Sequence, residues 1–273
     1  MLERLLLMHK IEKRHYFAML LGFAYSLIGI ITAFFLFKDF MSLASIFLTT
    51  LLLVPTLIYY LGKEEKIERE EGLKHFFRNH KDVFETYLFI FHGVFLGFLL
   101  IGFFALNVNY DVSAYQFDFL KARGITPDGV SVVPDSTIGQ VVNIIGRNLT
   151  VNVVAFFLSI AYGAGAIFLI VYNASIFASF IVLLVRYLST TTAHATAIFA
   201  TMLIHLVPEI SGFLLAAIAG GVISRALMRE RIGSLAFRNV IKDATVMFLL
   251  SIVLIVLAAF LEIYVTRGVF RLF

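Results

Sequence analysis

The chain has 273 residues, of which 60% are hydrophobic and 15% are charged, and its mean hydropathy is +0.94. Soluble domains carry about 25% charged residues, so this composition excludes an ordinary water-soluble fold. The absence of cysteine excludes a disulfide framework, a thiolate metal site and a cysteine nucleophile. The net charge of +4 lies in the loops and gives no reason to expect a nucleic acid partner. We therefore expect an integral membrane protein whose surroundings are the lipid bilayer.

Seven segments contain no Asp, Glu, Lys or Arg. They are Tyr16–Phe37, Phe40–Gly62, Thr86–Tyr110, Asn148–Val185, Tyr187–Pro208, Ile210–Ser224 and Ala244–Leu261. Most are long enough to cross about 30 Å of hydrocarbon as a helix of roughly 20 residues. The first begins too late for a secretory signal and has no small-residue cleavage site after it, so no cleaved signal is expected. The sequence therefore predicts an all-α, polytopic transmembrane helical bundle.

Lys and Arg residues gather in three of the loops. They number four in residues 1–15, six in 63–81 and five in 225–242, but only three in 107–147. Because short cytoplasmic loops carry an excess of Lys and Arg, the first three segments should be cytoplasmic and 107–147 external. We expect a multi-pass protein of the cell membrane with a cytoplasmic N-terminus.

We expect the chain to form two regions. Residues 1–85 are expected to form an N-terminal two-helix membrane region with a cytoplasmic connector, and residues 86–273 a membrane domain that includes the external segment. The connector Lys63–Glu85 mixes both signs of charge with apolar residues, and we expect it to be a solvated connector. A cytoplasmic helix lying partly against the membrane or the bundle is the alternative.

Two helix breaks are predicted in the second half of the chain. As one helix, Asn148–Val185 would be about 57 Å long, so we expect a turn near Tyr172-Asn173. Pro208 lacks a backbone donor and should open or kink the next apolar stretch. With a cytoplasmic segment after residue 225, the parity requires seven crossings plus one re-entrant or half helix, His194–Val207. The alternative makes 174–190 the partial helix.

A few polar residues are stranded inside the apolar segments, and we predict that they form a polar membrane core. They are Asn152, Tyr162, Asn173, His205 and Glu209. If a helix begins at Pro208, the Glu209 carboxylate would lie on its free amides and positive dipole end. His205 lies four residues earlier, and a histidine–carboxylate pair could conduct protons, bind a metal or act as acid and base. No H-E-x-x-H or other hydrolase spacing is present, so we assign no catalytic residue, metal or cofactor.

Small residues recur at four-residue spacing in two helices. One column is Ala155, Ser159 and Gly163, and the other is Gly212, Ala216, Gly220 and Ser224. Such columns let helix backbones approach closely, which predicts packing within the chain. A homodimer face formed by one column is the alternative. Gly163 and Gly165 should add flexibility in the middle of their apolar segment.

Several of these residues together resemble a known family. They are Asn148, Asn152, Gly163, Gly165, Asn173, His205, Pro208, Glu209, Gly220 and Gly221. Their pattern resembles the stage II sporulation protein M family in its archaeal-like form, over about residues 148–228 and more loosely back to residue 86. Two positions differ, since Ile204-His205-Leu206 stands where the family often has Pro-His-Gly and Asn173-Ala174 where it has Asn-Gly.

The resemblance implies a membrane scaffold, because sporulation members act in a complex that recruits cell-wall hydrolases during engulfment. We do not transfer that wall-remodelling role to this chain. We expect a scaffold or assembly protein without catalytic activity of its own, which partners other membrane proteins or itself. A transporter or channel that uses the polar core at His205 and Glu209 is the alternative from another class. An intramembrane metalloenzyme is a second alternative.

Overall fold

The computed structural model describes residues 14–104, 113–121, 125–126, 129–130, 138–163, 165–189 and 191–266. Much of the predicted external segment 107–147 and most of the basic segment 1–15 lie outside these residues. Seven of the described helices are long and apolar enough to cross a membrane. They are α2 (Tyr16–Leu36), α3 (Met41–Glu71), α4 (Phe76–Phe104), α6 (Ile138–Tyr162), α7 (Gly165–Leu188), α8 (Thr192–Arg229) and α9 (Leu235–Phe260). The prediction of an all-α polytopic bundle is confirmed.

The remaining elements are short. A 3-10 turn (Lys38–Phe40) joins α2 to α3, and α5 (Ala114–Lys121) follows α4. Strands β1 (Ile125–Thr126) and β2 (Gly129–Val130) pair antiparallel. A π-helical turn (Leu261–Thr266) continues α9. None of these elements changes the class of the fold, since each is too short to cross a bilayer.

The long segment Asn148–Val185 turns back at Gly163, so the prediction of a turn near Tyr172-Asn173 is wrong. Gly163 has φ +60°, and its N–H donates to the carbonyl of Ser159 at 2.7 Å. This left-handed conformation after the last helical residue is the usual glycine end of a helix. Asn173 lies inside α7 instead. The position of the turn therefore depends on a glycine that can adopt positive φ. The length of the apolar segment does not determine it.

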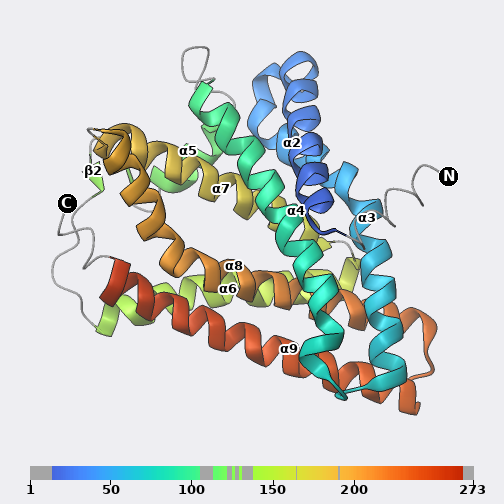
Figure 1. The fold of residues 1–273 in the computed structure, drawn as a ribbon. Helices are drawn as coiled ribbons and strands as arrows, with labels where there is room; N and C mark the ends of the chain where they lie inside the picture. Colours follow the sequence, from blue (N-terminus) through green and yellow to red (C-terminus); the bar gives the residue numbers. More distant parts are fainter. Residues whose placement is uncertain are drawn as a thin grey trace.

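The prediction of a re-entrant or half helix at His194–Val207 is also wrong. These residues and those after Pro208 belong to one continuous helix, α8. The alternative partial segment 174–190 belongs almost entirely to α7. Proline removes one hydrogen bond and bends a helix without necessarily ending it, and the ribbon of α8 changes direction along its length in Figure 1. The described residues contain seven long apolar helices. Three of them, α6, α7 and α8, lie between the predicted external segment and the basic segment after residue 225, and three is an odd number, as the predicted topology requires.

Helix α8 forms the centre of the bundle. Every residue from Gly212 to Ser224 is buried, as expected of a helix that is apolar all round. Figure 1 shows α8 running alongside α6 and α9, while α2, α3 and α4 cross at a steep angle to them. Ala18 and Ile46 from the N-terminal helices share one hydrophobic core with Ile218 and Val240. The N-terminal helices are thus packed into the same core as α8 and α9.

Candidate functional site

The small-residue columns lie at the contacts of α8 with α6 and α9. A Cβ on Gly220 would lie 2.2 Å from the carbonyl oxygen of Phe156 and 2.6 Å from the Cβ of Ser159. A Cβ on Gly212 would lie 3.0 Å from side-chain atoms of Ile255. The buried column residues are Ala155, Ser159, Gly212, Ala216, Gly220 and Ser224. The buried column residues therefore pack helices within the chain.

Asn152 joins α6 to α9. Its Nδ2 donates to Ser251 Oγ at 2.9 Å, and both side chains are fully buried. Ser251 Oγ in turn donates to the carbonyl of Phe248 at 2.6 Å. Hydrogen bonds of this kind between membrane helices contribute about 0.6 to 2 kcal/mol each. Asn152, predicted as a polar core residue, is thus a link between two helices.

His205 joins α8 to the π-helical turn. Its Nδ1 lies 3.0 Å from the Oγ1 of Thr266, and both residues are buried. Glu209 is buried one helical turn further along α8. Because Pro208 lies within α8, Glu209 is not at a helix start, and the predicted contact with free helix amides is wrong. His205 and Glu209 do share one face of the same helix, as their spacing requires.

Two other predicted core residues lie elsewhere. Tyr162 is the last residue of α6 and is 75% exposed, so it does not belong to a buried polar core. Asn173 is half-buried within α7. Gly165 is the first residue of α7. The polar residues of the spans therefore contribute separate contacts at several places in the bundle.

The densest group of buried ionisable residues lies where α3, α4 and α9 meet, in a segment that the sequence suggested was a connector. Glu64 and Glu68 lie one turn apart on α3, His80 is in the second turn of α4, and Asp243 is on α9. Glu64, Glu68 and Asp243 are 0% exposed and His80 is 6% exposed. We call these four residues the His/carboxylate cluster. A solvated connector is excluded for this part of Lys63–Glu85.

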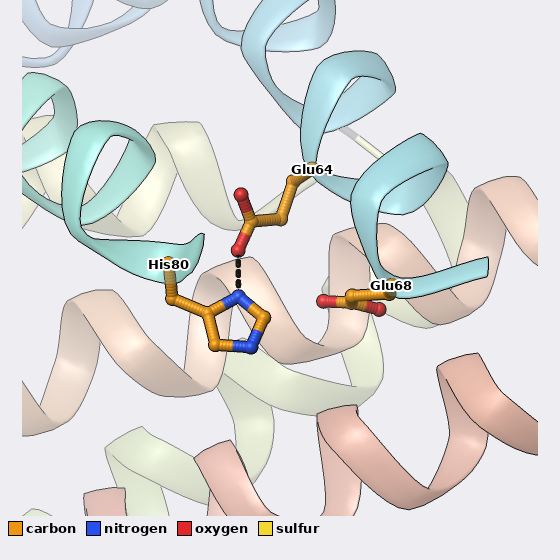
Figure 2. Close-up of side chains that lie close together, drawn as sticks. All are labelled: Glu64, Glu68 and His80. Carbon is orange, nitrogen blue, oxygen red and sulfur yellow. Dashed lines mark hydrogen bonds and ion pairs between the residues drawn. The ribbon is translucent and has the colours of Figure 1, made fainter. Parts of the chain in front are cut away.

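His80 contacts two carboxylates of the cluster. Its Nδ1 pairs with Glu64 Oε1, and its Nε2 lies 3.5 Å from Asp243 Oδ2. Figure 2 shows the Glu68 carboxylate pointing toward the same imidazole from the next turn of α3. One ligand atom each from Glu64, Glu68 and His80 lies within 4.8 Å of the others. The ring of Phe76 packs edge-on against the imidazole of His80, with 4.4 Å between the ring centroids. This contact restricts the orientation of the imidazole.

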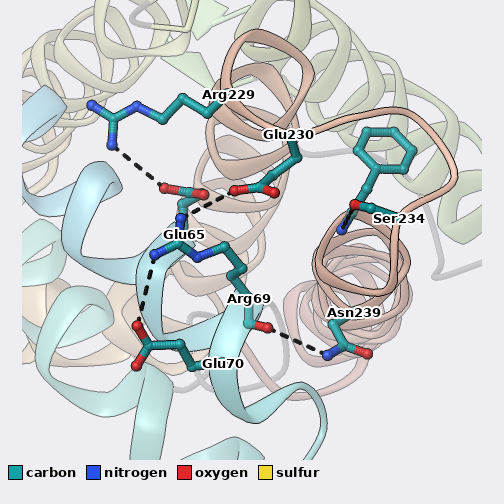
Figure 3. A network of polar contacts seen from close by, with 8 residues as sticks. Glu65, Arg69, Glu70, Arg229, Glu230, Ser234 and Asn239 are labelled. Atoms are coloured by element: carbon teal, nitrogen blue, oxygen red, sulfur yellow. Dashed lines mark hydrogen bonds and ion pairs between the residues drawn. The ribbon is translucent and has the colours of Figure 1, made fainter.

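Beside the His/carboxylate cluster, ion pairs link α3 to the end of α8 and to Glu230, the residue directly after α8 (Figure 3). Arg229 Nη1 lies 3.8 Å from Glu65 Oε2, and Arg69 Nη1 lies 3.1 Å from Glu230 Oε1. The Nδ2 of Asn239 donates to the carbonyl of Arg69 at 3.4 Å. These arginines compensate Glu65 and Glu230. Among the ion pairs of the described residues, the carboxylates of the cluster meet only His80.

A separate pocket of about 500 Å³ lies between α3 and α8. Lys63, Arg225 and Arg229 line it together with Tyr59. Arg225 also donates to the carbonyl of Ile58 at 3.3 Å. With three cationic side chains, the pocket complements anions, which distinguishes it chemically from the His/carboxylate cluster.

The cluster has a signal in the sequence that the predictions did not use. The buried face of α3 runs through Leu53, Leu57 and Leu61, and at the same helical spacing it continues through Glu64 and Glu68. Carboxylates that continue an apolar face are buried in the same interface as the residues before them. No local pattern, however, indicates that Asp243 would meet them.

Seven apolar helices, one of which is the buried central helix α8, define a polytopic helical membrane protein. The model of the family described as Stage II sporulation protein M matches residues 86–267, which are more than half of the chain. The chain belongs to this family. No curated protein and no solved structure matches it. Asp243 lies inside the matched region, whereas Glu64, Glu68 and His80 precede it.

Proposed function

We propose that the protein is a membrane scaffold or assembly protein without catalytic activity of its own. The observation that carries this proposal is the use of the stranded polar residues as links between helices. Asn152 is bonded to Ser251 across α6 and α9, and His205 to Thr266 across α8 and the π-helical turn. Polar groups that hold helices together supply rigidity, which a scaffold needs.

The close contacts at the central helix support the same function. Gly220 brings α6 against α8 with no room for a methyl group, and a Cβ on Gly212 would be in tight contact with α9 at 3.0 Å. Because packed interfaces of this kind resist sliding, the bundle is suited to holding partners in a set arrangement. We propose that these partners are other membrane proteins or a second copy of the chain. We also propose that the N-terminus faces the cytoplasm of the cell membrane, on the evidence of the basic loops.

A transporter is the competing function, because Glu209 and His205 are ionisable residues buried in α8. The test is ion and proton flux into liposomes that contain the full chain, compared for wild type and Glu209→Gln. Ser211→Ala is the matched control, since Ser211 is on the same helix with its hydroxyl bonded to the carbonyl of Val207. For a scaffold we expect flux equal to that of empty liposomes in all three samples.

The outcome that contradicts the scaffold is a wild-type flux that Glu209→Gln abolishes at an unchanged melting temperature. A second measurement tests the positive claim. When solubilised from native membranes, the chain should migrate as a complex larger than itself and contain other membrane proteins or further copies. Recovery only as a free monomer, under mild detergent, would exclude an assembly role.

A further inference from the structure

We propose that the His/carboxylate cluster binds one divalent transition-metal ion of the Zn²⁺ or Mn²⁺ type. The site is made by Glu64, Glu68, His80 and Asp243, which come from three helices. This inference does not depend on the scaffold function. It rests on the geometry of the cluster, on its unbalanced charge and on the chemistry of its donors.

The geometry is close to that of a coordinated ion. Metal bonds to imidazole nitrogen and carboxylate oxygen are about 2.0–2.2 Å long, so two ligands of one ion are at most about 4.4 Å apart. The ligand atoms of Glu64, Glu68 and His80 lie within 4.8 Å of one another. The Nε2 of His80 is already 3.5 Å from Asp243 Oδ2.

The charge of the cluster points to a cation. Three carboxylates are fully buried around a single imidazole. Within the part of the chain that the structure describes, both oxygens of Glu68 and both oxygens of Asp243 are buried without a hydrogen-bond partner. Buried carboxylates without partners are strongly unfavourable, so such groups are paired or coordinate metals. A divalent ion compensates the charge that the one imidazole cannot.

The two ring nitrogens of His80 face different carboxylates, and this indicates which residues would bind the ion and which would position the histidine. His80 Nδ1 contacts Glu64 Oε1, and its Nε2 faces Asp243 Oδ2 at 3.5 Å, as the second nitrogen of a metal-bound histidine commonly faces a carboxylate. The Nε2 has no hydrogen-bond partner among the described residues and faces Asp243, while Glu68 points to the same imidazole in Figure 2. We therefore assign Glu64, Glu68 and His80 as ligands and Asp243, which faces the second ring nitrogen of His80, as the positioning residue. One nitrogen and two carboxylates suit Zn²⁺ or Mn²⁺, and they are too few oxygens for Ca²⁺.

The position of the site gives the ion a structural consequence. Glu64, Glu68 and His80 belong to the hairpin of α3 and α4, ahead of the region that matches the family model. Asp243 belongs to α9 inside that region. A bound ion would hold the imidazole of His80 in place against Asp243, and so fix the N-terminal helices against α9. Removing it should loosen this junction and leave the contacts of α8 with α6 in place.

The experiment uses the full chain, purified in detergent with a tag that contains no histidine and stripped with a chelator. Zn²⁺ is titrated against a competing chelator, and bound zinc is counted by elemental analysis. We expect one Zn²⁺ per chain and a rise in melting temperature on binding. Glu68→Gln should weaken binding at least about tenfold and lose the rise. Glu65→Gln is the matched control, because Glu65 is equally buried but faces Arg229, and it should bind as wild type.

A second measurement does not depend on the folding of a variant. Co²⁺ added to the stripped wild-type chain should give the visible absorption of a coordinated ion, and Zn²⁺ should displace it. His80→Gln, which keeps a polar side chain, should remove this absorption. The proposal is overturned if the wild-type chain binds no stoichiometric Zn²⁺ and shows no Co²⁺ absorption. It is also overturned if folded Glu68→Gln or folded His80→Gln binds Zn²⁺ as tightly as wild type.

Discussion

Gly220 offers a direct test of the packing between α8 and α6. In Gly220→Ala the new methyl group would lie 2.2 Å from the carbonyl oxygen of Phe156 and 2.6 Å from the Cβ of Ser159. The first contact is with backbone, which no rotamer change can relieve, so α6 must move away from α8. Overpacking of this kind costs about 1–3 kcal/mol.

Helix propensity acts in the opposite direction. Replacing glycine by alanine inside a helix contributes roughly 0.5–1 kcal/mol of stability. The expected net effect of Gly220→Ala is therefore a loss of about 1–2 kcal/mol, because the clash involves two atoms of α6 and one of them is backbone. Gly146→Ala is the matched control. Gly146 is an exposed glycine of α6, and nothing lies within 4 Å of the place that a methyl group would take there, so this change should be neutral or stabilising.

The assay is equilibrium unfolding of the two variants and the wild type in the same mixed micelles. A lower free energy of unfolding for Gly220→Ala, beside an equal or higher one for Gly146→Ala, supports the packing. If Gly220→Ala is as stable as Gly146→Ala, the backbones of α6 and α8 do not approach each other at this residue and the reasoning is refuted.

Three further predictions follow from named contacts. Asn152→Ala and Ser251→Ala should each lower the free energy of unfolding by about 1 kcal/mol, and the double variant by less than the sum, whereas strict additivity in the double-mutant cycle would mean that the hydrogen bond contributes nothing. Gly163→Ala, at φ +60°, should destabilise the α6–α7 turn by about 1 kcal/mol while Gly163→Asn loses less; equal melting temperatures for the two variants would count against a left-handed turn there. Zn²⁺ affinity should fall on acidification, because the imidazole of His80 and the carboxylates beside it must be free of protons to bind a metal, and a pH-independent affinity in competition titrations would argue against this ligand set.

The sequence alone determined the class of the protein and the number of its spans. Apolar length is a local property, since each helix satisfies its own backbone in lipid and must be about 20 residues long. The columns at Gly212 and Gly220 were recognisable for a similar reason, because four-residue spacing places them on one face wherever the helix lies. The resemblance carried by residues such as His205 and Gly220 agrees with the family match.

Only the tertiary structure decided where the helices end and which polar groups meet. The turn at Gly163 and the continuity of α8 through Pro208 depend on φ values and on neighbours that accept a bent helix, and apolar length contains neither. The meeting of Glu68 and His80 with Asp243 depends on how α3, α4 and α9 pack, and contacts between residues so far apart in the chain leave no local pattern. A segment with both signs of charge therefore resembled a solvated connector, although the packing of three helices buries its carboxylates around one histidine.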